Sequence, residues 1–321
     1  MSTPKIDVVM PVYNAEAYVG DAVRSILHQR FSNLRLICVD DGSTDRSREI
    51  LRKLAANDER LEIIRQENRG VVRALNRGLS VCTAPLIARM DADDISMPER
   101  FARQVEFLEQ NPNVLAVGTS ILEMDSEGAP LGVQYFASDH EEIDSGMLRI
   151  RTGMAHPTVM MRRQAVQALS GYRVEFEWVE DLDLWLRMAE QGRLANLPEV
   201  LLCYRQHASS ISWSVGRVRR ERTIALMEEA YARRGLTLPV GLIERCRANR
   251  SPCGPGKWAR KASRHGQWGV ACKHLRRQWK QAPWSLLTWR TTLEVAARST
   301  FGRLLKGESK LPKVPCYHEA A

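Results

Sequence analysis

The first 125 residues alternate between two apolar periodicities, and this alternation restricts the fold more than any other feature of the chain. Short apolar runs typical of buried strands occur at five places, and four of them are followed by a segment with helical spacing. The five runs are 6–10, 34–40, 61–66, 85–91 and 114–124. Strands that alternate with helices in this way predict a doubly wound, mostly parallel α/β sheet.

The middle of the chain shows a mixed pattern. We expect a short strand that enters a helix over 154–166, an amphipathic helix over 180–192 and an apolar strand over 200–205. The pair Ser96 and Glu99 has the spacing of a capping box, which predicts a helix start just after the fourth strand.

From residue 214 onward the pattern is helical and rich in Arg and Lys. Residues 266–298 predict a helical hairpin that turns at Ala282–Pro283. We therefore expect two domains, an α/β domain over 1–213 and a basic helical extension over 214–321. The last dozen residues contain two prolines, and we expect them to be frayed.

Charge is divided unevenly between these two parts. Residues 217–321 contain 23 Lys or Arg and 7 Asp or Glu, a net charge of +16, whereas the whole chain carries +9, so residues 1–216 carry −7. Such asymmetry predicts different partners for the two regions. A basic region of this size is suited to an anionic membrane surface or to nucleic acid.

Targeting and redox features favour a cytoplasmic protein. The sequence contains no run of about 18 uncharged apolar residues, so it predicts no membrane-spanning helix. The N-terminal stretch lacks the basic and apolar regions of a signal peptide. The 7 cysteines form no C-x-x-C pair, and their odd number argues against a complete disulfide framework.

Acidic and hydroxyl side chains follow three of the predicted strands. The first strand leads into PVYN at 11–14, the second into VDDGSTD at 39–45 and the fourth into MDADD at 90–94. The carboxyl ends of parallel strands meet at one edge of a sheet, where ligands bind. Neither a G-x-G-x-x-G nor a P-loop pattern occurs. Phosphate groups would therefore be held by a metal ion and by basic side chains.

The cluster Asp91, Asp93 and Asp94 is the strongest indication of a metal site. Carboxylates so close together repel one another, but they suit Mg²⁺ or Mn²⁺, which commonly bridge protein carboxylates to phosphates. The alternative is a solvated acidic turn whose charges stabilise the N-terminus of the next helix. The loops at 11–14 and 39–45 could likewise be ordinary turns.

Four motifs in a fixed order give the chain a resemblance to a known family. PVYN, DDGSTD and DADD are followed by WVEDLDLWLRM at 178–188, and together they resemble the family 2 glycosyltransferases, which have the GT-A fold. The resemblance covers roughly residues 4–212. It implies an inverting, metal-dependent enzyme that moves a sugar from a nucleotide-diphosphate donor, expected to be a UDP-sugar, to a hydroxyl of a glycan or lipid-linked glycan in cell-surface polysaccharide synthesis.

The resemblance also implies roles on the donor side of the site. Asp93 would ligate Mg²⁺ or Mn²⁺. His207, in the segment YRQH, would approach the metal or the diphosphate. The residues expected to contact the donor nucleotide, or in the last case its ribose or the metal shell, are Pro11, Tyr13, Asp41, Arg73 and Asp91.

On the acceptor side, the resemblance implies that Asp181 is the catalytic base. Glu180, His156 and Trp185 are weaker candidates for acceptor contacts, and Trp185 suits the core equally well. Asp181 could instead only cap its own helix. Asp183 lies about 200° around the helix from Asp181, so we expect its substitution to matter least.

Two further interpretations stay open at this point. A metal-dependent sugar nucleotidyltransferase would also use acids and a metal, although it would carry a Gly-rich, basic loop after the first strand, where this chain has PVYNAEAY. A protein without enzymatic activity could bind nucleic acid through the basic extension and its tryptophans. Those tryptophans fall at helical spacings that suit packing, which makes nucleic acid the less favoured partner.

Overall fold

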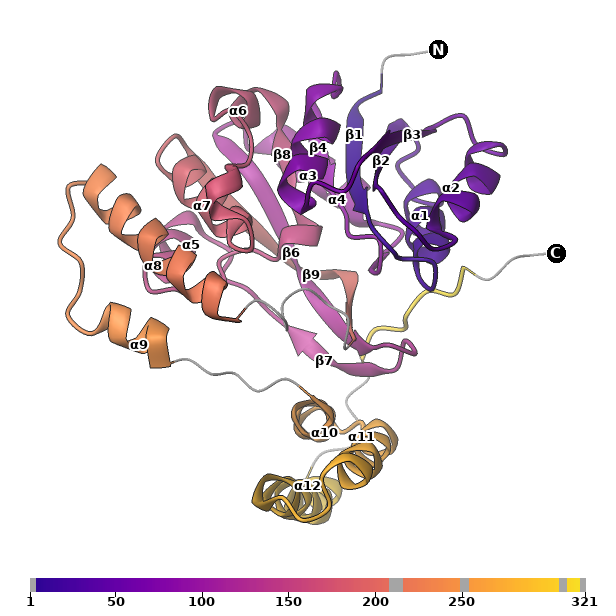
Figure 1. Ribbon diagram of the computed structural model, residues 1–321, viewed down its shortest axis with the longest axis vertical. Helices are drawn as coiled ribbons and strands as arrows, with labels where there is room; N and C mark the ends of the chain where they lie inside the picture. The colour runs from indigo at the N-terminus through magenta and orange to yellow at the C-terminus, as the bar shows by residue number, and fades with distance from the viewer. Residues whose placement is uncertain (1–3, 208–215, 249–253, 306–310, 318–321) are drawn as a thin grey trace.

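A single nine-stranded sheet organises the computed structural model, which describes residues 4–207, 216–248, 254–305 and 311–317 (Figure 1). The strand order is β3-β2-β1-β4-β8-β6-β9-β5, and β7 pairs with β6 outside this path. The strands are β1 (Ile6–Val12), β2 (Leu34–Asp41), β3 (Leu61–Gln66), β4 (Leu86–Arg89), β5 (Ile95–Ser96), β6 (Val114–Asp125), β7 (Pro130–Gln134), β8 (Met160–Arg162) and β9 (Arg193–Gln206).

Helices connect these strands and continue beyond the last one. The helices before β9 are α1 (Val19–Leu27), α2 (Ser47–Ala55), α3 (Val71–Ser80), α4 (Arg100–Gln110), α5 (His140–Met147), α6 (Arg163–Ala168) and α7 (Glu180–Ala189). The later helices are α8 (Gly216–Arg233), α9 (Leu242–Ala248), α10 (Pro255–Arg264), α11 (Trp268–Gln281) and α12 (Leu286–Leu305). Two 3-10 turns, His156–Thr158 and Val174–Phe176, complete the described elements.

The N-terminal half is parallel, as predicted. β1 pairs in parallel with both β2 and β4, and β2 pairs in parallel with β3. These strands are mostly apolar because helices cover both faces of the sheet. One core lies under α1, α2 and α4, and a second lies under α3, α5 and α7. The doubly wound, mostly parallel α/β fold is confirmed.

Short reversed strands complete the sheet. The sequence predicted the short strand at β8, which leads into α6, but it did not predict β5 or β7. β8 runs antiparallel between β4 and β6, β7 runs antiparallel to β6, and β5 runs antiparallel to β9. β5 also corrects the predicted capping box, because Ser96 lies in this strand and its hydroxyl accepts a hydrogen bond from Gln29. α4 begins only at Arg100, without a side-chain cap.

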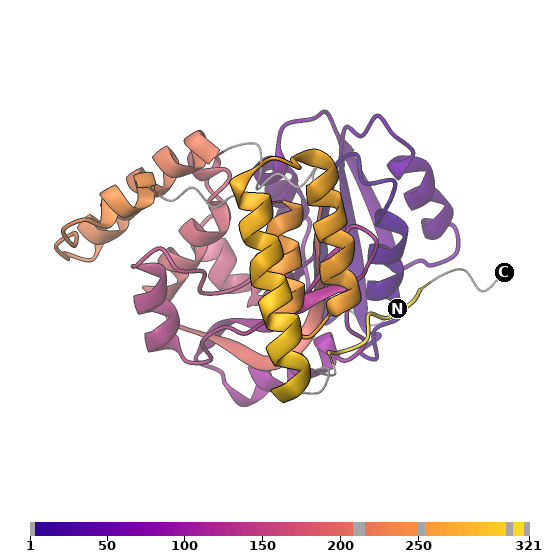
Figure 2. The same ribbon diagram turned by 90° about the horizontal axis from the view of Figure 1, so that it is seen from below.

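The C-terminal helices are present, and they form a hairpin at the predicted turn. α11 ends at Gln281 and α12 begins at Leu286. α10, α11 and α12 form a layer beyond β7, on the lower side of Figure 1, and Figure 2 shows this layer face on. α8 instead packs beside α7, and its buried side chains join the core there. The predicted domain boundary at 213/214 falls outside the described residues.

The end of the chain is ordered where it is described, contrary to the expectation of fraying. Leu311, Val314 and Tyr317 pack against the core under α1. The Tyr317 hydroxyl donates a hydrogen bond of 3.4 Å to the carbonyl of Ser96. Among the described residues, no helix is long and apolar enough to cross a membrane.

Candidate active site

The loops after β1 and β2 are bonded to each other at the carboxyl edge of the sheet. Asn14 adopts a positive φ of 47°, a conformation that Asn tolerates better than most residues. Its side-chain oxygen accepts a hydrogen bond of 2.8 Å from the backbone N–H of Thr44, and its own N–H donates to the Ser43 hydroxyl. PVYN and DDGST therefore form one structural unit, with the half-exposed ring of Tyr13 at its surface.

Asp41 ends β2 and is held by the loop that follows β3. Its carboxylate accepts hydrogen bonds from the Gln66 side chain at 2.7 Å and from the backbone N–H groups of Arg69 and Gly70 at 2.9 and 3.0 Å. The residue is almost fully buried. A carboxylate fixed in this way on the edge of a cavity is preorganised to accept a hydrogen bond from a ligand.

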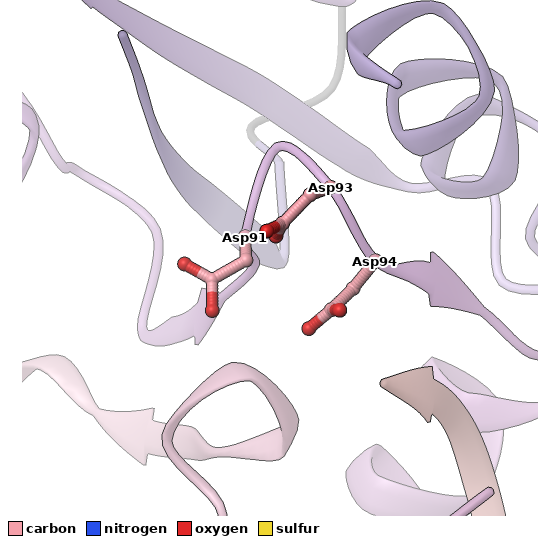
Figure 3. A group of neighbouring side chains, drawn as sticks. All are labelled: Asp91, Asp93 and Asp94. Carbon is pink, nitrogen blue, oxygen red and sulfur yellow. The ribbon is translucent and has the colours of Figure 1, made fainter. Parts of the chain in front are cut away.

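The three aspartates of DADD gather on one side of the loop between β4 and β5 (Figure 3). Each offers a carboxylate oxygen within 4.8 Å of the others. Asp91 forms an ion pair with Arg89, and Asp93 is 2.8 Å from Nε2 of His207. Asp94 accepts a hydrogen bond of 2.8 Å from the backbone N–H of Arg205. The end of β9 therefore closes over the cluster.

Burial and mutual repulsion disfavour the ionised forms of two aspartates in this cluster. Burial, together with repulsion from Asp93 and Asp91, raises the pKa of Asp94 well above its ordinary value. Burial also raises the pKa of Asp91, against the opposing attraction of Arg89. One oxygen of Asp94 is buried and has no hydrogen-bond partner among the described residues.

The donor set fits a divalent cation. Three carboxylates converge, with the His207 imidazole beside one of them, Asp93. Mg²⁺ and Mn²⁺ favour carboxylate oxygens as ligands. The orphaned oxygen of Asp94 and the mutual repulsion of the acids are the features that a bound cation would relieve. The three aspartates, with His207 beside Asp93, are therefore the candidate residues for such an ion.

A cavity of about 970 Å³ brings the predicted site residues together. This volume is at the upper end of the range usual for small-molecule sites. Nine of the eleven predicted residues line it, namely Pro11, Tyr13, Asp41, Asp91, Asp93, His156, Glu180, Asp181 and His207.

The other two predicted residues lie elsewhere. Arg73 is exposed on α3 and does not line the cavity, whose wall there is formed by Gly70, Val71 and Ala74. The helical period explains this, because Arg73 points away from the face that Val71 and Ala74 share. Trp185 is 1% exposed and lies in the core, where its ring meets the edge of His156 at 5.8 Å.

Two carboxylates from the start of α7 face the aspartate cluster. Asp181 accepts a hydrogen bond of 2.7 Å from the adjacent Leu182 N–H, and its charge contributes to the raised pKa of Asp91. Burial and repulsion by Asp181 raise the pKa of Glu180 to about 7. Trp178 precedes them with a positive φ of 76°, which is strained for a bulky residue. Such strain is typical of functional sites.

His156 is held neutral beside this pair. Burial, with a further contribution from the positive charge of Arg89, lowers the pKa of His156 well below its usual value. Its Nε2 lies 2.8 Å from the Tyr172 hydroxyl. A neutral imidazole of this kind can orient a hydroxyl-bearing ligand without adding charge.

Sequence reasoning missed several cavity residues. Arg89 is buried beside Asp91, and Arg219 reaches the cavity from α8. Arg89 could have been suspected because it stands two positions before the cluster in RMDADD. Arg219 lies among many other arginines, and no pattern distinguishes it. Glu123 of β6 and Gln134 of β7 line the cavity because these strands pair beside it.

Comparisons with known proteins agree with this geometry. The family model for glycosyl transferase family 2 matches residues 7–169. The putative glycosyltransferase EpsE of Bacillus subtilis is 38% identical over 214 residues, which is 65% of this chain and 76% of that protein. The O-antigen biosynthesis glycosyltransferase WbnJ of Escherichia coli is 34% identical over 211 residues, 64% of this chain and 81% of that protein.

Solved structures show the same fold. Residues 1–349 of TarS from S. aureus, in complex with UDP-GlcNAc, superpose with a TM-score of 0.60 at 15% identity, covering 91% of this chain and 79% of that one. The mannosyltransferase PcManGT from Pyrobaculum calidifontis, with GDP-Man and Mn²⁺, gives a TM-score of 0.54 at 18% identity, covering 94% and 87%. The chain belongs to glycosyl transferase family 2 and is a glycosyltransferase with a GT-A-like fold.

Proposed function

We propose that the protein is an inverting, divalent-metal-dependent glycosyltransferase that uses a nucleotide-diphosphate sugar, with UDP as the nucleotide. One observation carries the proposal. One cavity is lined by two members of the aspartate cluster, Asp91 and Asp93, by His207, and by a separate carboxylate, Asp181. For a sugar bound between them, a metal ion would contact the diphosphate leaving group, and Asp181 would lie near the hydroxyl that attacks the anomeric carbon.

On the donor side, the residues of this chain would hold the nucleotide and its diphosphate. Asp41 and Tyr13 would contact the nucleotide, and Asp91, Asp93 and His207 would hold Mg²⁺ or Mn²⁺. Such an ion, when bound, neutralises the charge that develops on the diphosphate as the sugar leaves. Arg89 keeps Asp91 in place through their ion pair.

On the acceptor side, Asp181 would take the proton of the attacking hydroxyl. A single base on the face opposite the leaving group leads to one displacement and to inversion at the anomeric carbon. Glu180, with its pKa raised to about 7, would be protonated in about half of the molecules near neutral pH and could then donate a hydrogen bond to the acceptor. Neutral His156 would contact the same ligand from the cavity wall.

The acceptor is proposed from the named relatives. EpsE, WbnJ and the amylovoran biosynthesis glycosyltransferase AmsE of Erwinia amylovora are bacterial glycosyltransferases, two of them named for a polysaccharide. We infer a glycan or lipid-linked glycan acceptor in cell-surface polysaccharide synthesis. The enzyme would then work in the cytoplasm at the inner face of the cell membrane, with residues 1–213 as catalytic domain and 214–321 as extension.

A panel of ligands tests the donor and the metal together. The melting temperature is measured with UDP-, GDP-, CDP- and dTDP-sugars, each with Mn²⁺ and with a chelator. Ligand at about 100 times its Kd stabilises the folded state by about 2.7 kcal/mol. We expect the largest rise for a UDP-sugar with Mn²⁺. An equal rise with the chelator would contradict metal dependence, and a larger rise with another nucleotide would contradict UDP.

A further inference from the structure

Helix α12 has the reverse of the usual surface pattern. A surface helix normally buries its apolar stripe and exposes its polar face. α12 buries Thr288 and Thr291 along with Val295. Its exposed positions include Leu286 at 88%, Leu293 at 68% and Trp289 at 49% exposure. Leu286, Trp289 and Leu293 are therefore exposed to solvent, while two threonines point inward.

These exposed residues form one continuous surface. Leu286, Trp289 and Leu293 follow a spacing of three and four residues, which places them on one side of the helix. Trp284, which is 89% exposed, extends the surface at the turn before α12. We call these four residues the apolar face of α12. Trp279 packs its ring edge-on against Trp289, with the ring centroids 4.7 Å apart, so the face has a fixed support.

The helices that carry and support the apolar face are rich in positive charge. Residues 254–299 contain 10 Lys or Arg and a single acid, Glu294. Some of these basic residues bind the sheet, as Lys261 does with Glu123 and Lys273 with Asp125. Others are exposed, and in the described parts of the chain no ion pair involves Arg276, Lys280 or Arg298. The outer surface of the layer is therefore both apolar and strongly basic.

The layer is fixed relative to the active site. Leu131 of β7 packs among the buried residues of α10 and α11. Gln134, at the end of the same strand, lines the cavity. Both views show α12 on the outside of the layer, away from the sheet (Figures 1 and 2). A surface that the apolar face contacts would thus lie on the outer side of the helical layer, whose inner side packs on β7.

We propose that the apolar face of α12 inserts into the interfacial region of an anionic lipid bilayer. Tryptophan and leucine on one helical face, surrounded by Lys and Arg, are suited to this boundary between headgroups and acyl chains. Anionic headgroups would meet the basic residues. A second copy of the chain fits less well, because pairing two such faces would bring two basic surfaces together. The proposal deepens the lipid-linked acceptor and rests on that part of the proposed function.

Vesicle co-sedimentation of the full chain tests the proposal. The vesicles are phosphatidylcholine alone or phosphatidylcholine mixed with phosphatidylglycerol. The test variant is Leu286→Ser/Trp289→Ser/Leu293→Ser, and the matched control is Leu236→Ser/Val240→Ser, which removes two other exposed apolar side chains between α8 and α9. We expect preference for the mixed vesicles and a fall in partitioning of at least about tenfold for the test variant only, since each lost apolar group weakens insertion.

Three outcomes would overturn the proposal. The first is equal partitioning of the test variant and the wild type. The second is complete loss of wild-type binding at high salt, which would indicate surface charge without insertion. The third is no vesicle binding at all, with a wild-type dimer that the test variant turns into a monomer in light scattering. The assay contains no donor or acceptor, so failure of sugar transfer would leave its result unaffected.

Discussion

Substitution of Asp183 is expected to lower stability, whereas substitution of Asp181 is expected to lower the transfer rate, although the two residues are only two positions apart. Asp183 is fully buried and bonded to two arginines. Arg187 donates to it at 2.7 and 3.0 Å, and Arg173 donates to it as well. Arg187 also holds the carbonyls of Leu169 and Gly171. Asp183 therefore neutralises the charges that join α7 to the preceding loop.

The cost of Asp183→Asn follows from this burial. Removing one partner of a buried ion pair leaves an uncompensated charge and costs about 3–5 kcal/mol. For a domain of this size, that loss lowers the melting temperature on the order of 10 °C. Glu229→Gln is the matched control, because Glu229 forms the partly exposed end of the same network with Arg173. It should cost less than about 1 kcal/mol.

Asp181→Asn should spare the fold and stop the chemistry. Asn can still accept the hydrogen bond from Leu182, so the melting temperature and the donor affinity should stay close to wild type. The transfer rate should fall by about 10²- to 10⁴-fold, the contribution of a positioned general base. Initial rates, donor affinity and melting curves of all three variants decide the matter. Near wild-type transfer by Asp181→Asn, or an unchanged melting temperature for Asp183→Asn, would refute the reasoning.

Three other predictions concern the cavity and its support. Asp93→Ala should abolish Mn²⁺-dependent transfer and weaken nucleotide binding more than Asp94→Ala does. If titration calorimetry shows the larger loss of nucleotide affinity for Asp94→Ala, the assignment of Asp93 as the main metal ligand is wrong. Glu180→Gln should raise the melting temperature at about pH 8 but not at about pH 4.5. The raised pKa of Glu180 means that the folded state loses stability as pH rises from about 4.5 to about 7, and Gln removes this loss. Equal changes in melting temperature at both pH values would contradict this. Trp258→Phe removes the indole N–H that donates to Gln206 at 2.7 Å. It should weaken Mn²⁺ binding several-fold while the melting temperature stays close to wild type. Unchanged Mn²⁺ affinity would show that the helical layer does not influence the metal site.

The strand ends could be predicted from the sequence because two simple rules apply to them. Apolar runs alternating with helical spacing specify a parallel sheet, and parallel strands deliver their following loops to one edge. Asp41 and Asp93 therefore meet in one cavity, as expected from PVYN, DDGSTD and DADD. The pairing of Asp93 with His207 spans 114 positions and came only from the family resemblance.

Other features could not be predicted because they depend on which distant segment covers a residue. Asp183 was expected to matter least, and the helical period did place it away from Asp181. The period cannot tell, however, that Arg173 and Arg187 close over it. Ser96 has a helix-capping pattern but is drawn into β5 by pairing with β9. The exposure of Leu286 and Leu293 on α12 likewise depends on which residues α10 and α11 bury.

The last residues of β9 connect these separate parts of the molecule. Arg205 holds the loop between β4 and β5: its backbone N–H donates to the Asp94 carboxylate, and its guanidinium donates to the Asp93 carbonyl. Gln206 is bonded to Glu123 and to Trp258 of the helical layer, and His207 then reaches Asp93 at 2.8 Å. Three consecutive residues therefore tie the acidic cluster, the cavity wall and the layer to one strand. A force that moves the layer, such as contact with a membrane, would act on the position of His207 through this strand. The helical layer is thus linked through the end of β9 to the aspartate cluster.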